Sequence, residues 1–438
     1  MYGNIHSLAQ YIAEPEEIDS LWTKVTESVD DIHHVVIEEY SLNSQFWPKR
    51  DNPQLWQHKL VIYNPLVRTT SQALLFVNGG TRNIETTRDN PKPHDINFKK
   101  IAANTQSVVV DLQDIPNQYL RLDDNKSRMG DALLAYTWQL FLSGSAKNES
   151  SILYFPMVKA VIKAMDAVQA ITAEFGRPKI DNFVLCGLSK RALTAWLATL
   201  IDERVNGLIP VVMDILNTLQ NMQHIYSFYN NQWPSALNDF SPEGLSRQIA
   251  NPQFAYLMNL QDPLYYMLED KNYYNRASVP KYIVSASGDD FFVPDSLNLY
   301  LDKLPGETKI RVVPNQSHFI DMGVVEDTLL FYYPSLIMGV KLPTLKWQTN
   351  SDKTICYLNF DVEPISINLW EAVNPERRDF RFAEGICYKS KGLDVKSNEH
   401  LTVKIDSPEL GWKAYFIEVT FPGSLILTTS IYVISGTS

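Results

Sequence analysis

The sequence has few cysteines and no long apolar run. Three cysteines among 438 residues cannot form a disulfide framework, although Cys356 and Cys387 could pair in the C-terminal region. No window approaches the roughly 18 consecutive apolar residues that a membrane-spanning helix needs. The N-terminus also lacks the basic start and apolar core of a secretory signal, so we expect no such signal and no membrane span in this chain.

Positive charge is also scarce. The net charge is -11 at pH 7 and the isoelectric point is near 5.3. Nucleic acids and anionic membranes are held mainly by lysine and arginine, so neither is an expected partner. We expect instead a small substrate such as a peptide or an ester. The sequence indicates no cofactor and no metal, and it leaves the oligomeric state open.

Two sequence patterns divide the chain near Leu342. In residues 1–341, short and almost continuously apolar segments alternate with helical patterns, which is typical of a mostly parallel sheet buried on both faces. The expected strands are 72–80, 107–114, 181–187, 205–214, 281–289 and 308–315. Residues 342–438 contain short segments separated by turn formers, which predicts an antiparallel β-sandwich. The predicted fold is an α/β-hydrolase sheet with this second domain appended, which we expect to be remote from the chemistry.

A long aromatic-rich segment, residues 217–277, separates two of the expected strands. Segments of this size inside compact domains usually serve as lids or caps. We therefore expect a helical cap insertion that sets specificity, with Tyr226, Tyr229 and Trp233 binding substrate. The alternative is that these rings only pack the cap onto the sheet.

The stretch "FVLCGLSKRALTA", residues 183–195, carries the candidate nucleophile. An apolar strand, Gly187, one residue, Ser189 and a helical pattern follow in the order of a nucleophile elbow, which exposes the serine oxygen above the sheet. The usual G-x-S-x-G string is incomplete, because Arg191 stands at its fifth position. Serine is also a favoured helix N-cap, so a purely structural role is the alternative.

The other members of a catalytic set follow in the order that α/β hydrolases use, serine, acid and histidine. His318 comes just after the last expected strand and is the candidate base. Asp289 and Asp290 end the preceding strand and are the candidate acids. Asp214 is a rival acid, but we expect it to pair with Arg191 beneath the elbow and to fix the turn.

Backbone amides near two strand ends could stabilise an oxyanion. The residue after the nucleophile, Lys190, would supply one donor. The loop "NGGTRN" would supply the other, because Asn78 and Gly80 lie where a glycine-rich backbone could approach a substrate closely. A simple turn is the alternative for this loop.

Several stretches together resemble one family. They are "LWQHKLVIYNP", "FVNGGTRN", "GLSKRALTAWL", "PKYIVSASGDDFFVPDS", "LPGETKIRVVPNQSH" and "AVNPERRDFRF". The chain is similar to the PhoPQ-activated pathogenicity-related proteins, which also look related to the autocrine proliferation repressor of social amoebae. The resemblance implies an exported, secreted or periplasmic hydrolase with aminopeptidase-like or dipeptidyl-peptidase-like activity, in which Ser189, Asp289 and His318 match the triad.

Two other functions remain open at this level. A carboxylesterase would use the same residues, and a secreted signalling or virulence-related binding protein could keep the fold without the activity. A peptidase that recognises a free N-terminus needs a carboxylate that meets the ammonium group. Glu243, Asp239 and Asp262 of the expected cap are the candidates.

Overall fold

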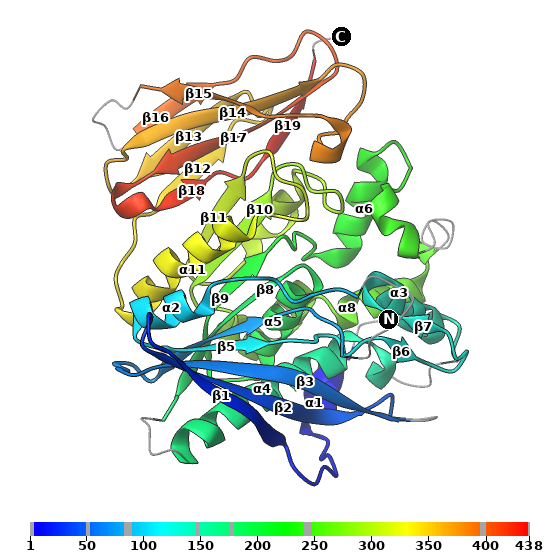
Figure 1. Cartoon of the computed structure of the whole chain (residues 1–438). Helices are drawn as coiled ribbons and strands as arrows, with labels where there is room; N and C mark the ends of the chain where they lie inside the picture. Colours follow the sequence, from blue (N-terminus) through cyan, green and yellow to red (C-terminus); the bar gives the residue numbers. More distant parts are fainter. Residues whose placement is uncertain are drawn as a thin grey trace.

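A nine-stranded sheet forms the centre of the molecule in the computed structural model, which describes residues 4–49, 53–82, 90–145, 149–174, 179–240, 248–394 and 400–436 (Figure 1). The strand order is β1-β2-β3-β5-β4-β8-β9-β10-β11. The bounds are β1 Trp22–Asp30, β2 Val35–Trp47, β3 Gln54–Pro65, β4 Gln72–Val77, β5 Val108–Leu112, β8 Asn182–Leu188, β9 Val205–Val211, β10 Lys281–Ala286 and β11 Thr308–Val313.

The six strands that the sequence predicts are all present and run parallel to their neighbours, from β5 across to β11. Strands β4 and β10 are buried at every position, which explains their continuous apolar character. Strands β1, β2 and β3 are additional and pair antiparallel, and β3 joins β5 antiparallel. The carboxyl ends of the parallel strands therefore meet at one edge of the sheet, where an α/β sheet places its ligand site.

Helices cover both faces of the sheet (Figure 1). Helix α4 has 21 residues, and its apolar stripe, which includes Val158, Met165 and Val168, is fully buried. The helices of its face are α1 Ser7–Ala13, α4 Tyr154–Glu174 and α5 Lys190–Ile201, and those of the other face are α2 Phe98–Thr105 and α11 Met322–Ile337. The sheet is thus enclosed between two apolar layers.

Short helices occupy the predicted cap insertion between β9 and β10. They are α6 Thr218–Phe228, η2 Ser235–Phe240, α8 Pro252–Leu260, α9 Pro263–Glu269 and α10 Lys271–Arg276. Helix α3, Gly130–Leu142, packs against η2 and α8. Shorter pieces are β6 Leu120–Arg121, β7 Ser127–Arg128, η1 Glu149–Ser151, η3 Ser296–Leu299 and η4 Leu301–Lys303.

The C-terminal region is the predicted antiparallel sandwich. One sheet contains β12 Leu345–Thr349, β13 Ile355–Phe360 and β16 His400–Lys404. The other contains β14 Ser366–Asn374, β15 Lys389–Leu393, β17 Trp412–Thr420, β18 Ile426–Thr428 and β19 Tyr432–Ser435. The connections include η5 Phe382–Glu384 and η6 Pro422–Ser424. Cys356 is buried, Cys387 is exposed and both are free thiols, so they do not pair.

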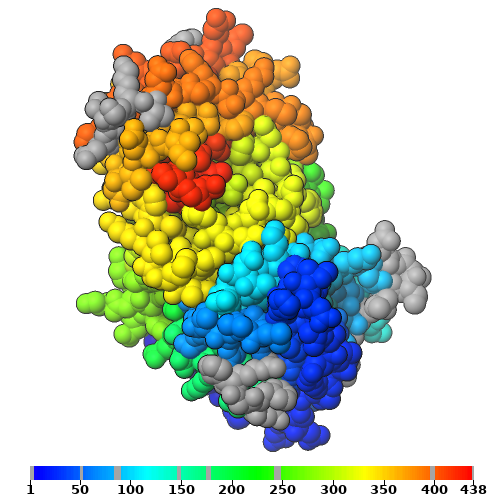
Figure 2. Space-filling view, turned by 60° about the vertical axis from the view of Figure 1, so that its left-hand side comes forward, coloured from blue at the N-terminus to red at the C-terminus, as the bar shows by residue number. Residues whose placement is uncertain are grey.

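The sandwich shares its core with the nine-stranded sheet. Phe380, Tyr388 and Phe416 belong to the same buried cluster as the residues of α4 and α5. Figure 2 shows the orange and red C-terminal residues in direct contact with the yellow residues of the preceding part of the chain. The prediction that this domain is remote from the chemistry is wrong, because its Phe382 amide donates a hydrogen bond of 3.0 Å to Gly288, the neighbour of Asp289.

No helix in the described part of the chain is long and apolar enough to cross a membrane.

Candidate functional site

Ser189 stands on a sharp turn between β8 and α5. Its backbone has φ 53° and ψ -130°, a conformation that L residues rarely adopt, and its side chain makes no capping bond to the helix. The turn is tight enough that a Cβ on Gly187 would lie 2.8 Å from the Arg191 backbone. Only glycine fits there. The local geometry is therefore that of a nucleophile elbow rather than that of an ordinary N-cap.

His318 lies between Ser189 and Asp289. Its Nε2 is 2.9 Å from Ser189 Oγ, and its Nδ1 is 2.8 Å from Asp289 Oδ2. A carboxylate can only accept, so Nδ1 carries the proton and donates it to Asp289, which leaves Nε2 as the acceptor for the serine hydroxyl. The ring also lies against Phe291, with 4.4 Å between the ring centroids. The structure thus brings the three predicted residues into one chain of hydrogen bonds.

The two neighbouring candidate acids lie in different surroundings. The other oxygen of Asp289, Oδ1, accepts from the amides of Phe291 at 2.7 Å and Phe292 at 3.1 Å, so the turn itself orients the carboxylate. Asp290 is only partly buried. Burial, and then the charge of Asp289, raise the pKa of its carboxyl. Of the two, Asp289 is the residue hydrogen-bonded to the imidazole.

Asp214 does not pair with Arg191, and that prediction is wrong. Asp214 accepts a hydrogen bond of 3.1 Å from Tyr300. Arg191 instead extends toward the loop after β5, where its Nε donates to the carbonyl of Ile115 at 2.6 Å. Its guanidinium lies so close to Gly79 that a Cβ there would be 3.1 Å from it. Arg191 therefore joins the elbow to the loop after β5 through a backbone carbonyl and packs against Gly79 in the loop after β4.

The other cation of the elbow, Lys190, pairs with Asp131 of α3 at 3.0 Å. Its side chain is almost fully buried, and burial lowers the pKa of its ammonium group while Asp131 opposes that effect. A cation in the first turn of a helix is disfavoured by the helix dipole, so the carboxylate of Asp131 offsets an unfavourable position.

The loop after β4 holds its shape through Asn78. The Asn78 amide donates to Asp111 at 2.8 Å and to the His94 carbonyl at 3.2 Å, and its oxygen accepts from the amide of Gly79. The backbone amide of Asn78 donates to the carbonyl of Leu112 at 2.7 Å, so Asn78 supports the loop and has no amide left to donate to an oxyanion. Two pockets lie beside Ser189, one beneath the cap and one lined by His94 and His318. Gly80 has φ 129°, yet among the described residues it lines neither of them.

The amide of Lys190 remains a candidate oxyanion donor. Lys190 is the first residue of α5, where amides have no acceptor within the helix. It also lines both pockets beside Ser189. His94 lines the second of these pockets, and the sequence did not indicate a role for this residue. Burial lowers the pKa of the His94 imidazole to about 4.

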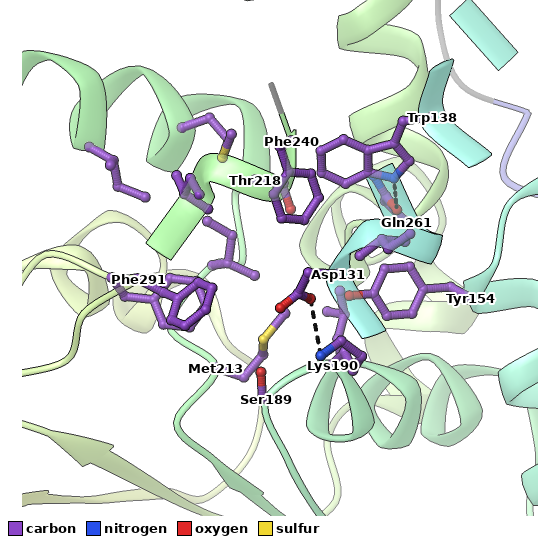
Figure 3. Close-up of a pocket in the computed structure, with 17 residues that line it drawn as sticks. Asp131, Trp138, Tyr154, Ser189, Lys190, Met213, Thr218, Phe240, Gln261 and Phe291 are labelled. Carbon is purple, nitrogen blue, oxygen red and sulfur yellow. Dashed lines mark hydrogen bonds and ion pairs between the residues drawn. The ribbon is translucent and has the colours of Figure 1, made fainter. Parts of the chain in front are cut away.

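An apolar pocket opens beside Ser189 beneath the cap (Figure 3). Its cavity has a volume of about 70 Å³. The apolar lining comes from α3, α5, α6, η2 and the strand ends, and comprises Leu134, Trp138, Leu193, Met213, Ile215, Met222, Ile225, Leu237, Phe240, Phe291 and Phe292. Figure 3 shows the ion pair of Asp131 and Lys190 next to Ser189, and the Trp138 indole donating to Gln261 farther away.

The aromatic residues expected to bind substrate lie elsewhere. Tyr229 and Trp233 line a separate cleft of about 800 Å³ between the cap and the C-terminal domain. Tyr226 packs on Trp233 with 5.0 Å between ring centroids. The cap residues that line the Ser189 pocket include one aromatic ring, Phe240, beside apolar Met222, Ile225 and Leu237 and polar Thr218 and Gln261. Aromatic density in the sequence therefore marked the cap but not its inner surface.

Two of the three carboxylates expected to meet an ammonium group, Asp239 and Asp262, do not line the pocket either. Asp239 is exposed in η2. Asp262 is buried and accepts from the amides of Asn217, Thr218 and Leu264, so it caps α9. Glu243 lies outside the described residues. The carboxylate in the pocket is Asp131, which no local sequence pattern marked.

The buried carboxyl of Asp214 allows a stability prediction. Burial raises its pKa to about 7, above the value of about 3.9 expected in the unfolded chain. The unfolded chain therefore ionises first as the pH rises, and the fold loses stability between about pH 4 and pH 7. Asp214→Asn has no carboxyl that ionises here and lacks this loss. The melting temperature of the variant minus that of the parent should therefore increase between about pH 4 and pH 7. Parallel melts at pH 4 and pH 8 measure it, and a constant difference would contradict the burial argument.

The fold and the geometry at Ser189 together identify the structural class of this protein. The sheet order, the elbow and the cap are those of the α/β-hydrolase fold. A solved acetyl xylan esterase from Thermoanaerobacterium sp. JW/SL YS485 aligns over 76% of this chain and 94% of its own, with a TM-score of 0.50 and 12% identity. At that identity the likeness establishes the fold alone.

The family follows from the sequence comparison. Residues 8–381 match the family described as PhoPQ-activated pathogenicity-related protein, and the chain belongs to it. A curated relative, autocrine proliferation repressor protein A of Dictyostelium discoideum, is 32% identical over 412 residues, which cover 87% of this chain and 79% of the relative. The resemblance recognised in the sequence is thereby confirmed.

Among the residues that the structure describes, no group of three or more histidine, cysteine or acidic side chains is placed to hold a metal ion.

Proposed function

We propose that this protein is a serine hydrolase that cleaves small peptides or esters through an acyl-enzyme. One observation carries the proposal: Ser189, on a strained turn, lies 2.9 Å from His318, which in turn lies 2.8 Å from Asp289. Strain of this kind costs about 1–3 kcal/mol and persists where function requires it. A protein that only binds a partner would not need a strained, partly exposed serine beside a base.

In the proposed mechanism, Ser189 Oγ attacks the acyl carbon while its proton passes to His318 Nε2. Asp289 holds the imidazole in the required tautomer and stabilises the imidazolium. The imidazolium then gives that proton to the leaving amine or alcohol, and the acyl-enzyme remains. Water then attacks the acyl carbon while one of its protons passes to His318 Nε2. His318 returns that proton to Ser189 Oγ as the bond to the acyl carbon breaks, which releases the acid and restores the serine. We assign oxyanion stabilisation to the Lys190 amide.

The pocket supports a substrate with a small apolar group next to the scissile bond. Its volume of about 70 Å³ is smaller than a cavity of roughly 150 Å³ that holds benzene. The ion pair of Lys190 and Asp131 beside Ser189 offers polar contacts to the rest of the substrate. We favour peptides over esters on the strength of the family resemblance, and the same machinery serves both.

We also propose that the protein acts outside the cytosol, in the periplasm or as a secreted protein. The Dictyostelium relative is named as an autocrine repressor, a description of a factor that acts on the cells that release it. The family description, pathogenicity-related, is consistent with action outside the producing cell.

A fluorophosphonate probe tests the proposed function. An activated serine attacks its phosphorus and expels fluoride, while an ordinary serine does not react. We expect one phosphonyl group, located on Ser189 by peptide mapping, and no label on Ser189→Ala. A folded parent protein without label would refute the proposal. Amide and ester substrates with the same acyl group then distinguish a peptidase from an esterase.

Phe240→Ala is expected to widen the pocket and shift specificity toward longer acyl groups. Phe240 lines the pocket and packs on Trp138 with 4.8 Å between ring centroids. Because one methylene group changes discrimination by about tenfold or more, the ratio of kcat/KM for hexanoyl over acetyl esters should rise by about tenfold. Trp233→Ala, in the separate cleft, is the matched control. If Trp233→Ala changed the ratio and Phe240→Ala did not, the outer cleft would be the specificity site.

A further inference from the structure

One loop of the C-terminal domain contacts the turns that carry both His318 and Asp289. We call residues 374–388 the clamp loop. Its shape is fixed from within: the Asn374 side chain accepts from the amides of Glu376 and Arg377 and donates to the carbonyl of Asp379. Arg381 makes two hydrogen bonds to Asp379, at 3.0 and 2.6 Å. The clamp loop is therefore an ordered element that can brace its neighbours.

Its first contact is with the turn that carries the acid. The amide of Phe382 donates to the carbonyl of Gly288 at 3.0 Å. The two backbones approach so closely that a Cβ on Gly288 would lie 2.7 Å from the Phe382 nitrogen. Asp289 is the next residue along the chain. The clamp loop thus limits where the acid turn can move.

Its second contact is with the turn that carries the base. Asn315 and Tyr388 exchange two hydrogen bonds. The side-chain amide of Asn315 donates to the Tyr388 carbonyl at 3.0 Å, and the backbone amide of Tyr388 donates to Asn315 Oδ1 at 2.7 Å. The backbone amide of Asn315 also donates to the hydroxyl of Ser287 at 2.9 Å, which ties the base turn to the acid turn. His318 follows three residues after Asn315.

A third contact extends the clamp loop to the cap. Arg378 donates to Asp295 at 3.0 Å, and the other oxygen of Asp295 lies 2.7 Å from His224 Nε2 in α6. The Arg378 guanidinium also lies over the ring of Phe228, 4.0 Å from its centroid. A single residue of the clamp loop therefore joins the segment after the acid turn to the cap helix.

The clamp loop is anchored by burial as well as by hydrogen bonds. Phe380 and Tyr388 are 1% and 3% exposed and belong to the main core. Moving the loop away would expose both rings to water, which the hydrophobic effect opposes.

From these contacts we infer that the clamp loop positions the catalytic acid and base, and that Asn315 is a positioning residue for His318. This inference rests on the proposed hydrolase function. It implies that the C-terminal domain is part of the active site's supporting structure, since a site that is held about 1 Å too loosely can lose about 100-fold in rate.

Asn315→Gly tests the inference with little change to the backbone. Asn315 has φ 57°, a left-handed conformation that glycine adopts freely, so the variant removes only the two hydrogen bonds to Tyr388. Asn125→Gly is the matched control, because Asn125 has φ 56° in an exposed turn far along the chain from the clamp loop. Arg377→Ala, which removes an exposed pair with Glu384 inside the clamp loop, is a second control.

Three quantities should be measured on each protein: the melting temperature, the rate of fluorophosphonate labelling of Ser189, and kcat and KM on one substrate. For folded Asn315→Gly we expect labelling and kcat to fall by about tenfold to 100-fold with KM unchanged, because alignment is lost and the pocket is not. Both controls should stay within about twofold of the parent. If Asn315→Gly is unfolded at the assay temperature, Asn315→Asp replaces it, because it keeps the acceptor for the Tyr388 amide and loses the donor.

The possible failures are distinguishable. If the parent is labelled and the folded Asn315 variant reacts within about twofold of it, the clamp loop does not position His318 and the hydrolase function stands. If the folded parent is not labelled at all, the proposed function fails and this inference fails with it. A loss of rate in Arg377→Ala equal to that in Asn315→Gly would show a general disturbance of the loop, and would also overturn the assignment to Asn315.

Discussion

Replacing Ser189 with glycine is expected to abolish turnover and to raise the stability of the fold at the same time. The backbone of Ser189, at φ 53° and ψ -130°, is strained for an L residue but accessible to glycine. Loss of the nucleophile should lower kcat by about 10⁶-fold, as in other enzymes with a triad. Relief of the strain should make the glycine variant about 1 kcal/mol more stable than Ser189→Ala.

The alanine variant separates the two effects. Ser189→Ala loses the hydroxyl and keeps the strain, so it should be equally inactive and no more stable than the parent. Ser227→Ala is the matched control for a serine substitution. It removes an exposed hydroxyl in helix α6 that donates a hydrogen bond to the His224 carbonyl. Urea denaturation and steady-state kinetics on the four proteins supply the data. Residual turnover in both Ser189 variants would remove this serine as nucleophile, and a glycine variant less stable than the alanine variant would contradict the strain argument.

Asp289→Asn is expected to leave the protein folded and to lower kcat by about 10⁴-fold. The asparagine oxygen can keep the two backbone amides that now donate to Asp289 Oδ1. Its NH₂ group then faces His318 Nδ1 and stabilises the wrong imidazole tautomer, in which Nε2 carries the proton and cannot accept one from Ser189. Stability should change by about 1 kcal/mol or less, because the packing and the turn are retained.

Asp290→Asn provides the comparison for this prediction. The Asp289 carboxylate, and not that of its neighbour, is hydrogen-bonded to the imidazole, so Asp290→Asn should lose only a small part of the activity. Single-turnover rates at saturating substrate and thermal melts on both variants decide the matter. If Asp290→Asn lost the larger part and Asp289→Asn remained active, the acid would have been assigned to the wrong carboxylate.

The sequence predicted those parts of the fold and of the site that depend on a single local pattern of residues. Strands β4 and β10 read as continuous apolar runs because both of their faces are buried. Ser189 and His318 were predictable because parallel strands bring their carboxyl ends to one edge, so residues just past those ends converge. The antiparallel strand β1 carries no such run, since it is almost entirely exposed.

The partners of the elbow could not be read from the sequence. Arg191 bonds the backbone carbonyl of Ile115, and a carbonyl acceptor has no side-chain signature. Asp131 meets Lys190 because α3 packs beneath the cap, an arrangement that depends on contacts between distant segments. The pairing of Arg191 with Asp214 rested on charge and strand order, which do not fix the direction of a long side chain.

The docking of the C-terminal domain also has a consequence for the order of synthesis. Tyr388 of the clamp loop, and Thr428 of β18, whose hydroxyl accepts from the amide of Val312 in β11, are translated well after His318. A nascent chain that has already emerged from the ribosome with its serine, acid and histidine therefore still lacks the contacts that brace their turns. If the clamp loop acts as we infer, the chain reaches its full activity only after the sandwich has been translated and folded.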